Sequence, residues 1–162
     1  MIDLLKEFDC VIRAFHEKHI RYAIIGGLAV AIYGGIRATR DMDFLIHPED
    51  LAQAGEALRK VGYQASEPWT FQKTGLTLHR WWKARGEDED LSLVDLLESH
   101  STEYLSMIER AVAEEWREGI ILPVACRADL IKLKEERGSH TDLADIEFLT
   151  GKKDSDEKPG IP

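Results

Sequence analysis

Cysteine and long apolar runs are both scarce in this chain, and each shortage excludes a class of protein. Cys10 and Cys126 are the two cysteines and lie far apart, so neither a disulfide scaffold nor a zinc site is expected. Both are expected to be small core residues. No apolar run approaches the roughly 18–20 residues that a membrane helix needs. Residues 1–15 carry acids and bases inside their apolar stretch, so we do not expect a signal peptide. We therefore expect a cytoplasmic protein that does not contact a membrane.

An excess of basic residues is also missing. The chain has 30 acidic residues against 21 lysines and arginines, which gives a formal net charge of −9. A tight, non-specific nucleic-acid binder usually presents a basic face, so the charge lowers the expectation of a nucleic-acid substrate. It does not exclude a local basic patch, and it suits a carboxylate-rich site for cations.

The length and the hydrophobic content predict one folded domain. The 162 residues are 44% hydrophobic, enough to bury a core. We expect the domain to cover residues 1–150, and the polar segment 151–162 to be a frayed tail. Neither an internal repeat nor a low-complexity segment divides the chain.

The spacing of apolar residues predicts alternating helices and strands. An amphipathic helix is expected over residues 3–18, a strand over 22–25 and a short buried helix over 28–33 that ends at Gly34. A strand is expected over 41–46, followed by a helix from Pro48 to Gly62. One or two strands are expected in 69–85, one over 91–97 and one over 119–124. The other expected helices are one capped by Ser101 with Leu105, Ile108 and Val112 inward, one over 128–137 and one over 141–149. This order predicts an α/β domain with a mixed sheet and a small helical C-terminal part.

Two acids lie inside one of the expected strands. Asp41 and Asp43 are two residues apart, so their side chains point to the same face of the sheet. Neighbouring carboxylates in an apolar strand repel each other, and a divalent cation between them removes that cost. Oxygen ligands suit magnesium or manganese. The alternative is a strand end in water, with both acids solvated or paired with Arg37 and Arg40.

A pair of glycines and a third acid favour the cation site over the solvated strand end. Gly26 and Gly27 stand where a strand turns into a helix, and glycine there lets the backbone approach a phosphate. Asp95 is an acid among apolar residues of another strand, either bonded to a nearby base or part of the same site. Three acids would make a site for two metal ions feasible.

Gly26-Gly27, Asp41-x-Asp43 after thirteen residues, and the later Asp95 together resemble the nucleotidyltransferase superfamily. The string GGLAVAIYGGIRATRDMDFLI most resembles its AbiEii-type branch, which includes toxins of bacterial toxin–antitoxin systems. A rear segment, DLIKLKEERGSHTDLADIEFL, is similar to the family helix in which a lysine, here Lys134, precedes an aspartate, here Asp142, by eight residues.

The resemblance implies a role for each matching residue. Gly26 and Gly27 would hold the nucleotide phosphates, and Thr39 and Arg40 would lie beside the triphosphate. Asp41, Asp43 and Asp95 would bind metal and act in catalysis, and Asp95 would also help to deprotonate the attacking hydroxyl. Lys134 and Asp142 would contact the nucleotide. The chain departs from the family in one place, because His140-Thr141 precede Asp142 where a basic residue is common.

The implied reaction moves a nucleoside monophosphate from a nucleoside triphosphate to a hydroxyl, with Arg37 and Arg40 able to bind the leaving phosphates. The acceptor would be a protein side chain or a tRNA, and an antitoxin protein would be a partner. Transfer to a small molecule, as in antibiotic-modifying nucleotidyltransferases, and an inactive nucleotide-binding module are the alternatives. Of Trp81 and Trp82, one is expected in the core and one exposed, where it could stack on a base.

Overall fold

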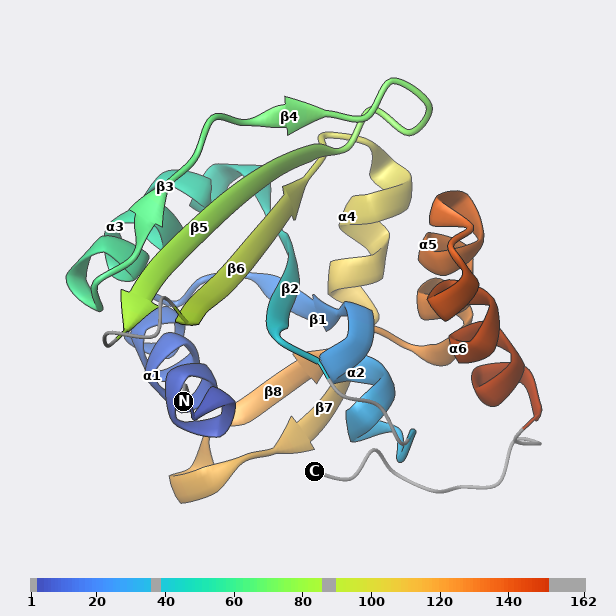
Figure 1. The fold of residues 1–162 in the computed structure, drawn as a ribbon, viewed down its shortest axis with the longest axis horizontal. Helices are drawn as coiled ribbons and strands as arrows, with labels where there is room; N and C mark the ends of the chain where they lie inside the picture. Colours follow the sequence, from blue (N-terminus) through green and yellow to red (C-terminus); the bar gives the residue numbers. More distant parts are fainter. Residues whose placement is uncertain (1–2, 36–38, 86–89, 152–162) are drawn as a thin grey trace.

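The computed structural model describes residues 3–35, 39–85 and 90–151, and the strands in this part of the chain form one mixed sheet of eight. The strands are β1 (Tyr22–Ile25), β2 (Asp41–Ile46), β3 (Gln64–Ala65), β4 (Trp69–Thr70), β5 (Thr77–Arg85), β6 (Asp90–Glu98), β7 (Val112–Glu115) and β8 (Ile121–Val124). Their order is β3-β5-β6-β2-β1-β8-β7, with β4 paired to β5. The expected α/β class with a mixed sheet is confirmed (Figure 1).

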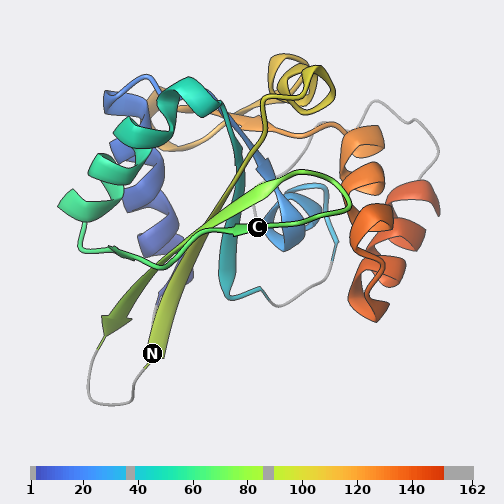
Figure 2. The same ribbon diagram turned by 90° about the horizontal axis from the view of Figure 1, so that it is seen from above.

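Helices cover both sides of the sheet. The helices are α1 (Leu4–Glu17), α2 (Gly26–Ile32), α3 (Leu51–Lys60), α4 (Thr102–Glu109), α5 (Arg127–Arg137) and α6 (His140–Gly151). Figure 2 shows α1 and α3 on one side of the sheet and α2, α5 and α6 on the other. The last two form the expected helical C-terminal part and pack against each other.

The apolar core lies between α1 and one face of the sheet. Asp41 and Asp43 lie on the opposite face of the central strands. Phe8, Val11, Ile12 and Phe15 lie one helical turn apart on α1 and are at most 1% exposed. Phe15 meets the ring of Phe44 edge to face at 5.4 Å between ring centres. Because side chains alternate along a strand, the neighbours of Phe44 in β2 point away from this core.

Most of the expected elements are present, with small differences at their ends. Pro48 opens a single 3₁₀ turn, and the α-helix starts only at Leu51. Ser101 stands at the N-cap of α4 without a capping bond from its side chain, and Tyr104 and Met107 are the residues that α4 buries. The expectation that Val112 faces inward from this helix is wrong, because Val112 begins β7, which alternation over so few residues did not reveal.

The two cysteines are not core residues, so that expectation is also wrong. Cys10 is exposed on α1 and Cys126 is partly exposed. The core of α1 is filled by its larger apolar residues, which leaves Cys10 on the outer face. Gly151 closes α6, while the rest of the expected tail and Arg37 lie outside the described residues. Within the described chain, no helix has the length and hydrophobicity to span a membrane.

Candidate functional site

The sheet register brings the three predicted acids onto one face. Parallel pairing of β2 with β6 sets Asp43 directly beside Asp95, and Asp41 beside Leu93. Burial, followed by the charges of Asp95 and Asp41, raises the pKa of Asp43 to about 7. No residue that the structure describes donates a hydrogen bond to the Asp43 carboxylate. The charges of Asp41 and Asp95 therefore both act on Asp43, and repulsion between Asp41 and Asp43 is what the sequence predicted.

Gly26 makes room for the Asp43 carboxylate. Its φ is +69°, a conformation that residues with a side chain rarely adopt. A Cβ atom at this position would overlap Asp43 Oδ2 and would lie 2.9 Å from Asp43 Cγ. Antiparallel pairing of β1 with β2 fixes this approach, because Ile25 is the partner of Asp43. The glycine at the turn is thus needed for the position of the acid as well as for the turn itself.

Asp95 has a partner that the sequence analysis did not name. Arg80 on β5 is paired in register with Asp95 and donates two hydrogen bonds of 2.8 Å, one to each carboxylate oxygen. The Asp95 side chain is 9% exposed and that of Arg80 is 44% exposed. Cross-strand alternation could have suggested the pair, but only once the register of β5 with β6 was known.

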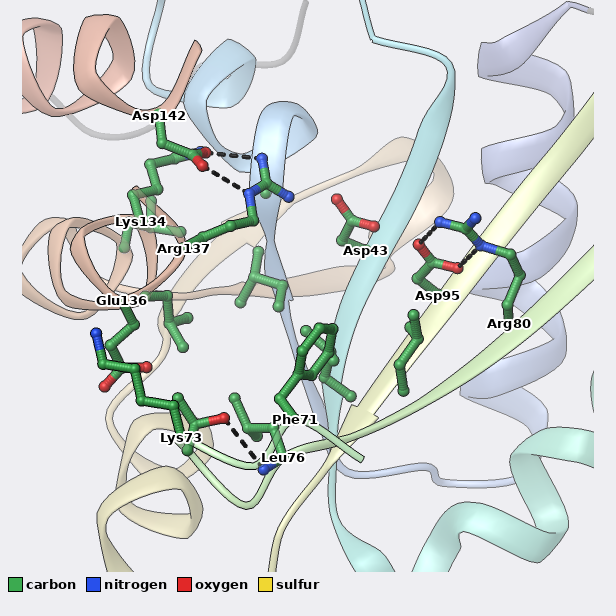
Figure 3. Close-up of a pocket in the computed structure, with 17 residues that line it drawn as sticks. Asp43, Phe71, Lys73, Leu76, Arg80, Asp95, Lys134, Glu136, Arg137 and Asp142 are labelled. Atoms are coloured by element: carbon green, nitrogen blue, oxygen red, sulfur yellow. Dashed lines mark hydrogen bonds and ion pairs between the residues drawn. The ribbon is translucent and has the colours of Figure 1, made fainter. Parts of the chain in front are cut away.

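A pocket of about 300 Å³ opens beside the acids (Figure 3). The acidic side is formed by Gly26, Asp43, Asp95 and Arg80. Its other walls come from the segment before β5, from β5 and β6, and from α5 and α6: Phe71, Lys73, Thr74, Leu76, Leu78, Leu97, Leu130, Leu133, Lys134, Glu136, Arg137 and Asp142. The combination of a charged end and apolar walls suits a ligand with an anionic part and a ring system.

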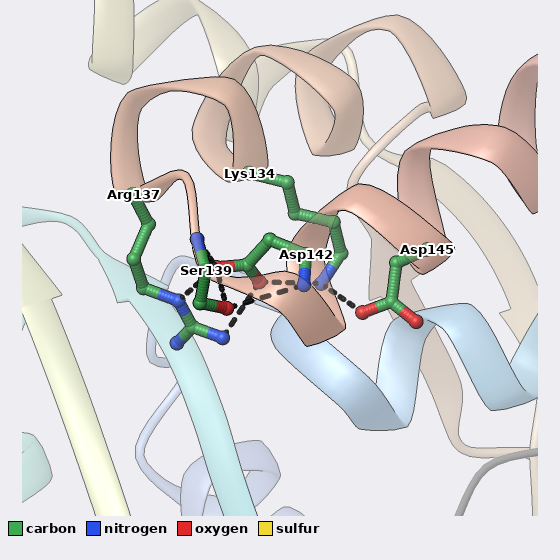
Figure 4. A network of polar contacts seen from close by, with 5 residues as sticks. All are labelled: Lys134, Arg137, Ser139, Asp142 and Asp145. Carbon is green, nitrogen blue, oxygen red and sulfur yellow. Dashed lines mark hydrogen bonds and ion pairs between the residues drawn. The ribbon is translucent and has the colours of Figure 1, made fainter.

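The rear motif forms a compact network of charges at the pocket wall (Figure 4). Arg137 donates hydrogen bonds of 2.6 and 2.7 Å to the two oxygens of Asp142, which also accepts one of 2.6 Å from the Ser139 hydroxyl. Burial would raise the pKa of Asp142, but these bonds lower it to about 2. Lys134 donates to Asp145 at 2.8 Å and lies 3.7 Å from Asp142. Arg137 thus supplies the basic partner that the sequence lacks directly before Asp142.

The other predicted site residues lie around these two groups. Gly27 is buried in the first turn of α2, next to Gly26. Thr39 donates its hydroxyl to the backbone carbonyl of Asp41 at 3.1 Å, and Arg40 is exposed. Trp81 is 6% exposed in the core, as expected of one of the two tryptophans, while Trp82 is partly buried on the face that carries Arg80.

The chemistry of the acids fits a divalent cation, although no described group of three or more histidines, cysteines, aspartates or glutamates is arranged as a complete metal site. The fit rests on Asp43, whose carboxylate faces two other acids and accepts no hydrogen bond from the described residues. A hard cation would relieve that repulsion through oxygen ligands. Asp41 and Asp43 are the residues that would hold it.

Known proteins agree with this arrangement at the level of the fold. A lincomycin-bound lincosamide antibiotic adenylyltransferase, LnuA, has 14% identity and a TM-score of 0.56, over 90% of this chain and 95% of that one. ANT(2″)-Ia in complex with adenylyl-2″-tobramycin has 16% identity and a TM-score of 0.57, over 90% and 87%. A candidate nucleotidyltransferase from Thermotoga maritima has 12% identity and a TM-score of 0.63, over 94% and 97%.

The sequence comparisons give the family. No curated protein matches the chain. A family model described as "uncharacterised nucleotidyltransferase" matches residues 2–130, which include Gly26, Gly27 and all three acids. This model does not single out the AbiEii-type branch, so that finer assignment stays a prediction. The chain belongs to this family of uncharacterised nucleotidyltransferases.

Proposed function

We propose that the chain transfers a nucleoside monophosphate from a nucleoside triphosphate to a hydroxyl acceptor, with Asp41 and Asp43 holding magnesium or manganese. The observation that supports this is the Asp43 carboxylate, which accepts no hydrogen bond from the described residues, lies close to Gly26 and feels the charges of Asp95 and Asp41. A carboxylate kept in that position is costly unless a cation is bound there. Family membership supports the reaction class.

The reaction would proceed by in-line displacement. The acceptor oxygen attacks the α-phosphorus, the bond from that phosphorus to the oxygen bridging the β-phosphorus breaks, and pyrophosphate leaves. The proton of the hydroxyl would pass to Asp95, which shares the face of the sheet with Asp43. A divalent ion, when bound, would neutralise charge on the phosphate oxygens. Gly26 and Gly27 would let those oxygens approach the backbone closely.

The nucleotide would occupy the pocket beside the acids. Its phosphates would lie near Asp43 and its base between the apolar walls. Arg137 would contact the phosphates, because its side chain is 60% exposed and its charge acts on Asp43. Lys134 and Asp142, predicted nucleotide contacts, line the pocket, and Asp142 would also hold Arg137 in place. Thr39 and Arg40 would act beside the triphosphate.

The acceptor is the least determined part of the reaction. A protein side chain or a tRNA is the first candidate, with an antitoxin partner if the AbiEii-type resemblance extends to function. Transfer to a small molecule is the second candidate, because the net charge of −9 disfavours a large nucleic-acid partner, and because two antibiotic adenylyltransferases share the fold. An inactive nucleotide-binding module is the third.

Label transfer tests the reaction and the acceptor together. The chain is incubated with each α-³²P-labelled nucleoside triphosphate, magnesium and an extract separated into protein, RNA and small-molecule fractions. We expect magnesium-dependent label in one fraction and none with Asp43→Asn. The labelled fraction identifies the class of acceptor. If no fraction is labelled although the chain still binds the nucleotide, the result would contradict transfer and support an inactive nucleotide-binding module.

Expression in cells separates the two acceptor classes. Growth arrest by the wild-type chain, relieved by Asp43→Asn, would support a macromolecular target and a toxin role. Normal growth with increased resistance to an antibiotic would support a small-molecule acceptor. Arrest by both forms alike would show that toxicity does not come from the transfer.

A further inference from the structure

The third acid of the site already has a cation beside it. Figure 3 shows Asp95 between Asp43 and the guanidinium of Arg80, with both Asp95 oxygens bonded to Arg80. From this we propose that Arg80 is a resident cation at Asp95, so that the site binds a single divalent ion, at Asp41 and Asp43, and not two. This inference rests on the proposed function and specifies its metal requirement.

The backbone fixes Arg80 in this place. Arg80, Asp95 and Asp43 lie in one row across β5, β6 and β2, because each is the register partner of the next. Cross-strand neighbours on one face are close enough for direct contact, and a shift by one residue would turn Arg80 to the other face. The position of the guanidinium therefore follows from strand pairing and does not depend on a mobile loop.

Both Asp95 oxygens that would face a second ion already accept a bond from Arg80. An arginine stays charged at every physiological pH, so Asp95 cannot lose this partner by deprotonation. Both Asp95 oxygens accept a short, charge-assisted bond. Each oxygen keeps a further lone pair, so Asp95 can still accept a proton or a hydrogen bond from the acceptor hydroxyl.

Electrostatics makes a second divalent ion unfavourable at Asp95. The charge of Arg80 is felt by Asp41 and Asp43 as well as by Asp95. A divalent ion placed within about 5 Å of a guanidinium would lose well over tenfold in affinity, even at an effective dielectric constant of about 20. Asp43 has no comparable partner among the described residues, so the first ion is favoured there.

Counting bound manganese tests the inference without any turnover. Mn²⁺ is titrated into the full chain, alone and with a non-reactive triphosphate analogue, and free Mn²⁺ is measured by electron paramagnetic resonance. We expect one ion per chain for the wild type and for Asp95→Asn. For Arg80→Gln we expect a second ion, with its dissociation constant lowered by at least about tenfold. Arg59→Gln, on α3 at the other face, makes the same change of charge and should bind one ion.

Each other result has a definite meaning. Two ions in the wild type, reduced to one by Asp95→Asn, would overturn the inference and support a two-metal site. One ion in both wild type and Arg80→Gln would show that Arg80 does not exclude the second ion. No ion in the wild type, even with the analogue, would contradict the metal site of the proposed function itself, and the inference with it. Thermal unfolding of each variant identifies any that fail to fold.

Discussion

Asp43 and Asp142 line the same pocket, but their surroundings are opposite. Asp142 is fully buried and accepts bonds from Arg137 and Ser139, which lower its pKa to about 2. Asp43 accepts no hydrogen bond from the described residues, and burial with two neighbouring acids raises its pKa to about 7. Among the described residues, Asp142 has hydrogen-bond donors that compensate its charge, whereas Asp43 has none.

The difference distinguishes a charge that has partners within the fold, at Asp142, from a charge that we propose binds a cation, at Asp43. A compensated carboxylate stabilises the fold and holds its partners, here Arg137 and through it the joint between α5 and α6. A carboxylate that is kept uncompensated costs stability, which is a common property of sites that bind a ligand. The following variants break or sharpen this contrast.

Asp43→Asn should give the largest effects, in opposite directions for stability and activity. Label transfer should fall by at least about a thousandfold, because the proposed cation loses a charged ligand. Stability without metal should rise by at most about 4 kcal/mol at pH 8, since the pKa of Asp43 is raised from 3.8 to about 7.

The gain in stability from Asp43→Asn should depend on pH. An acid with a raised pKa destabilises the folded chain as pH increases from about 4 to about 7, so the advantage of Asp43→Asn should vanish near pH 4. Urea unfolding in EDTA at several pH values measures it. A variant that is less stable than the wild type at pH 8 would contradict the uncompensated state of Asp43.

Asp142→Asn should destabilise the chain, by about 2–4 kcal/mol, because Arg137 and Lys134 lose a buried partner. The lowered pKa means that this stability is present above about pH 4 and is lost as pH falls toward 2. Glu147→Gln on the exposed side of α6 is the control and should change stability by less than about 0.5 kcal/mol. Equal effects of the two substitutions in urea unfolding would argue against a structural role for Asp142.

Gly26→Ala should cost about 2–3 kcal/mol, since it adds both backbone strain and an overlap with Asp43. Gly119→Ala is matched to it, because Gly119 also has a positive φ, of +77°, but has nothing within 4 Å of an added Cβ. The control should cost only about 1–2 kcal/mol of strain and leave label transfer unchanged. If both variants retain full transfer, the close approach of Gly26 to Asp43 has no part in the reaction.

Phe71→Ala should have the smallest effect, about a three- to tenfold weaker binding of the triphosphate, because Phe71 forms part of the apolar wall. Trp69→Ala is its control, since Trp69 is 65% exposed and lies outside the pocket lining. Titration of a fluorescent nucleotide analogue measures both. Weaker binding by Trp69→Ala than by Phe71→Ala would contradict the proposal that the base lies in the pocket.

The sequence predicted the parts of the site that depend on local spacing. Asp41 and Asp43 share a face because strand alternation has a period of two, and Gly26 marks a turn with a positive φ, which glycine adopts most readily. Asp95 was singled out by its apolar neighbours. Its contact with Asp43 depends on the parallel pairing of β2 with β6, which apolar spacing does not encode.

The parts that were missed depend on how the strands pair and how the helices pack. Arg80 reaches Asp95 only through the register of β5 with β6, and Arg137 reaches Asp142 across the turn between two helices. The exposure of Cys10 follows from competition with larger apolar residues for the core side of α1. Such outcomes need the three-dimensional packing, which single residues do not reveal.

Anomalous diffraction from crystals grown with Mn²⁺ and a non-reactive triphosphate analogue tests the metal site most directly. We predict one anomalous peak, bonded to Asp41, Asp43 and phosphate oxygens near Gly26, with Arg80 still bonded to Asp95. A nucleotide and metal bound away from Asp43, or a pocket that stays empty at saturating analogue, would contradict the assignment of this site.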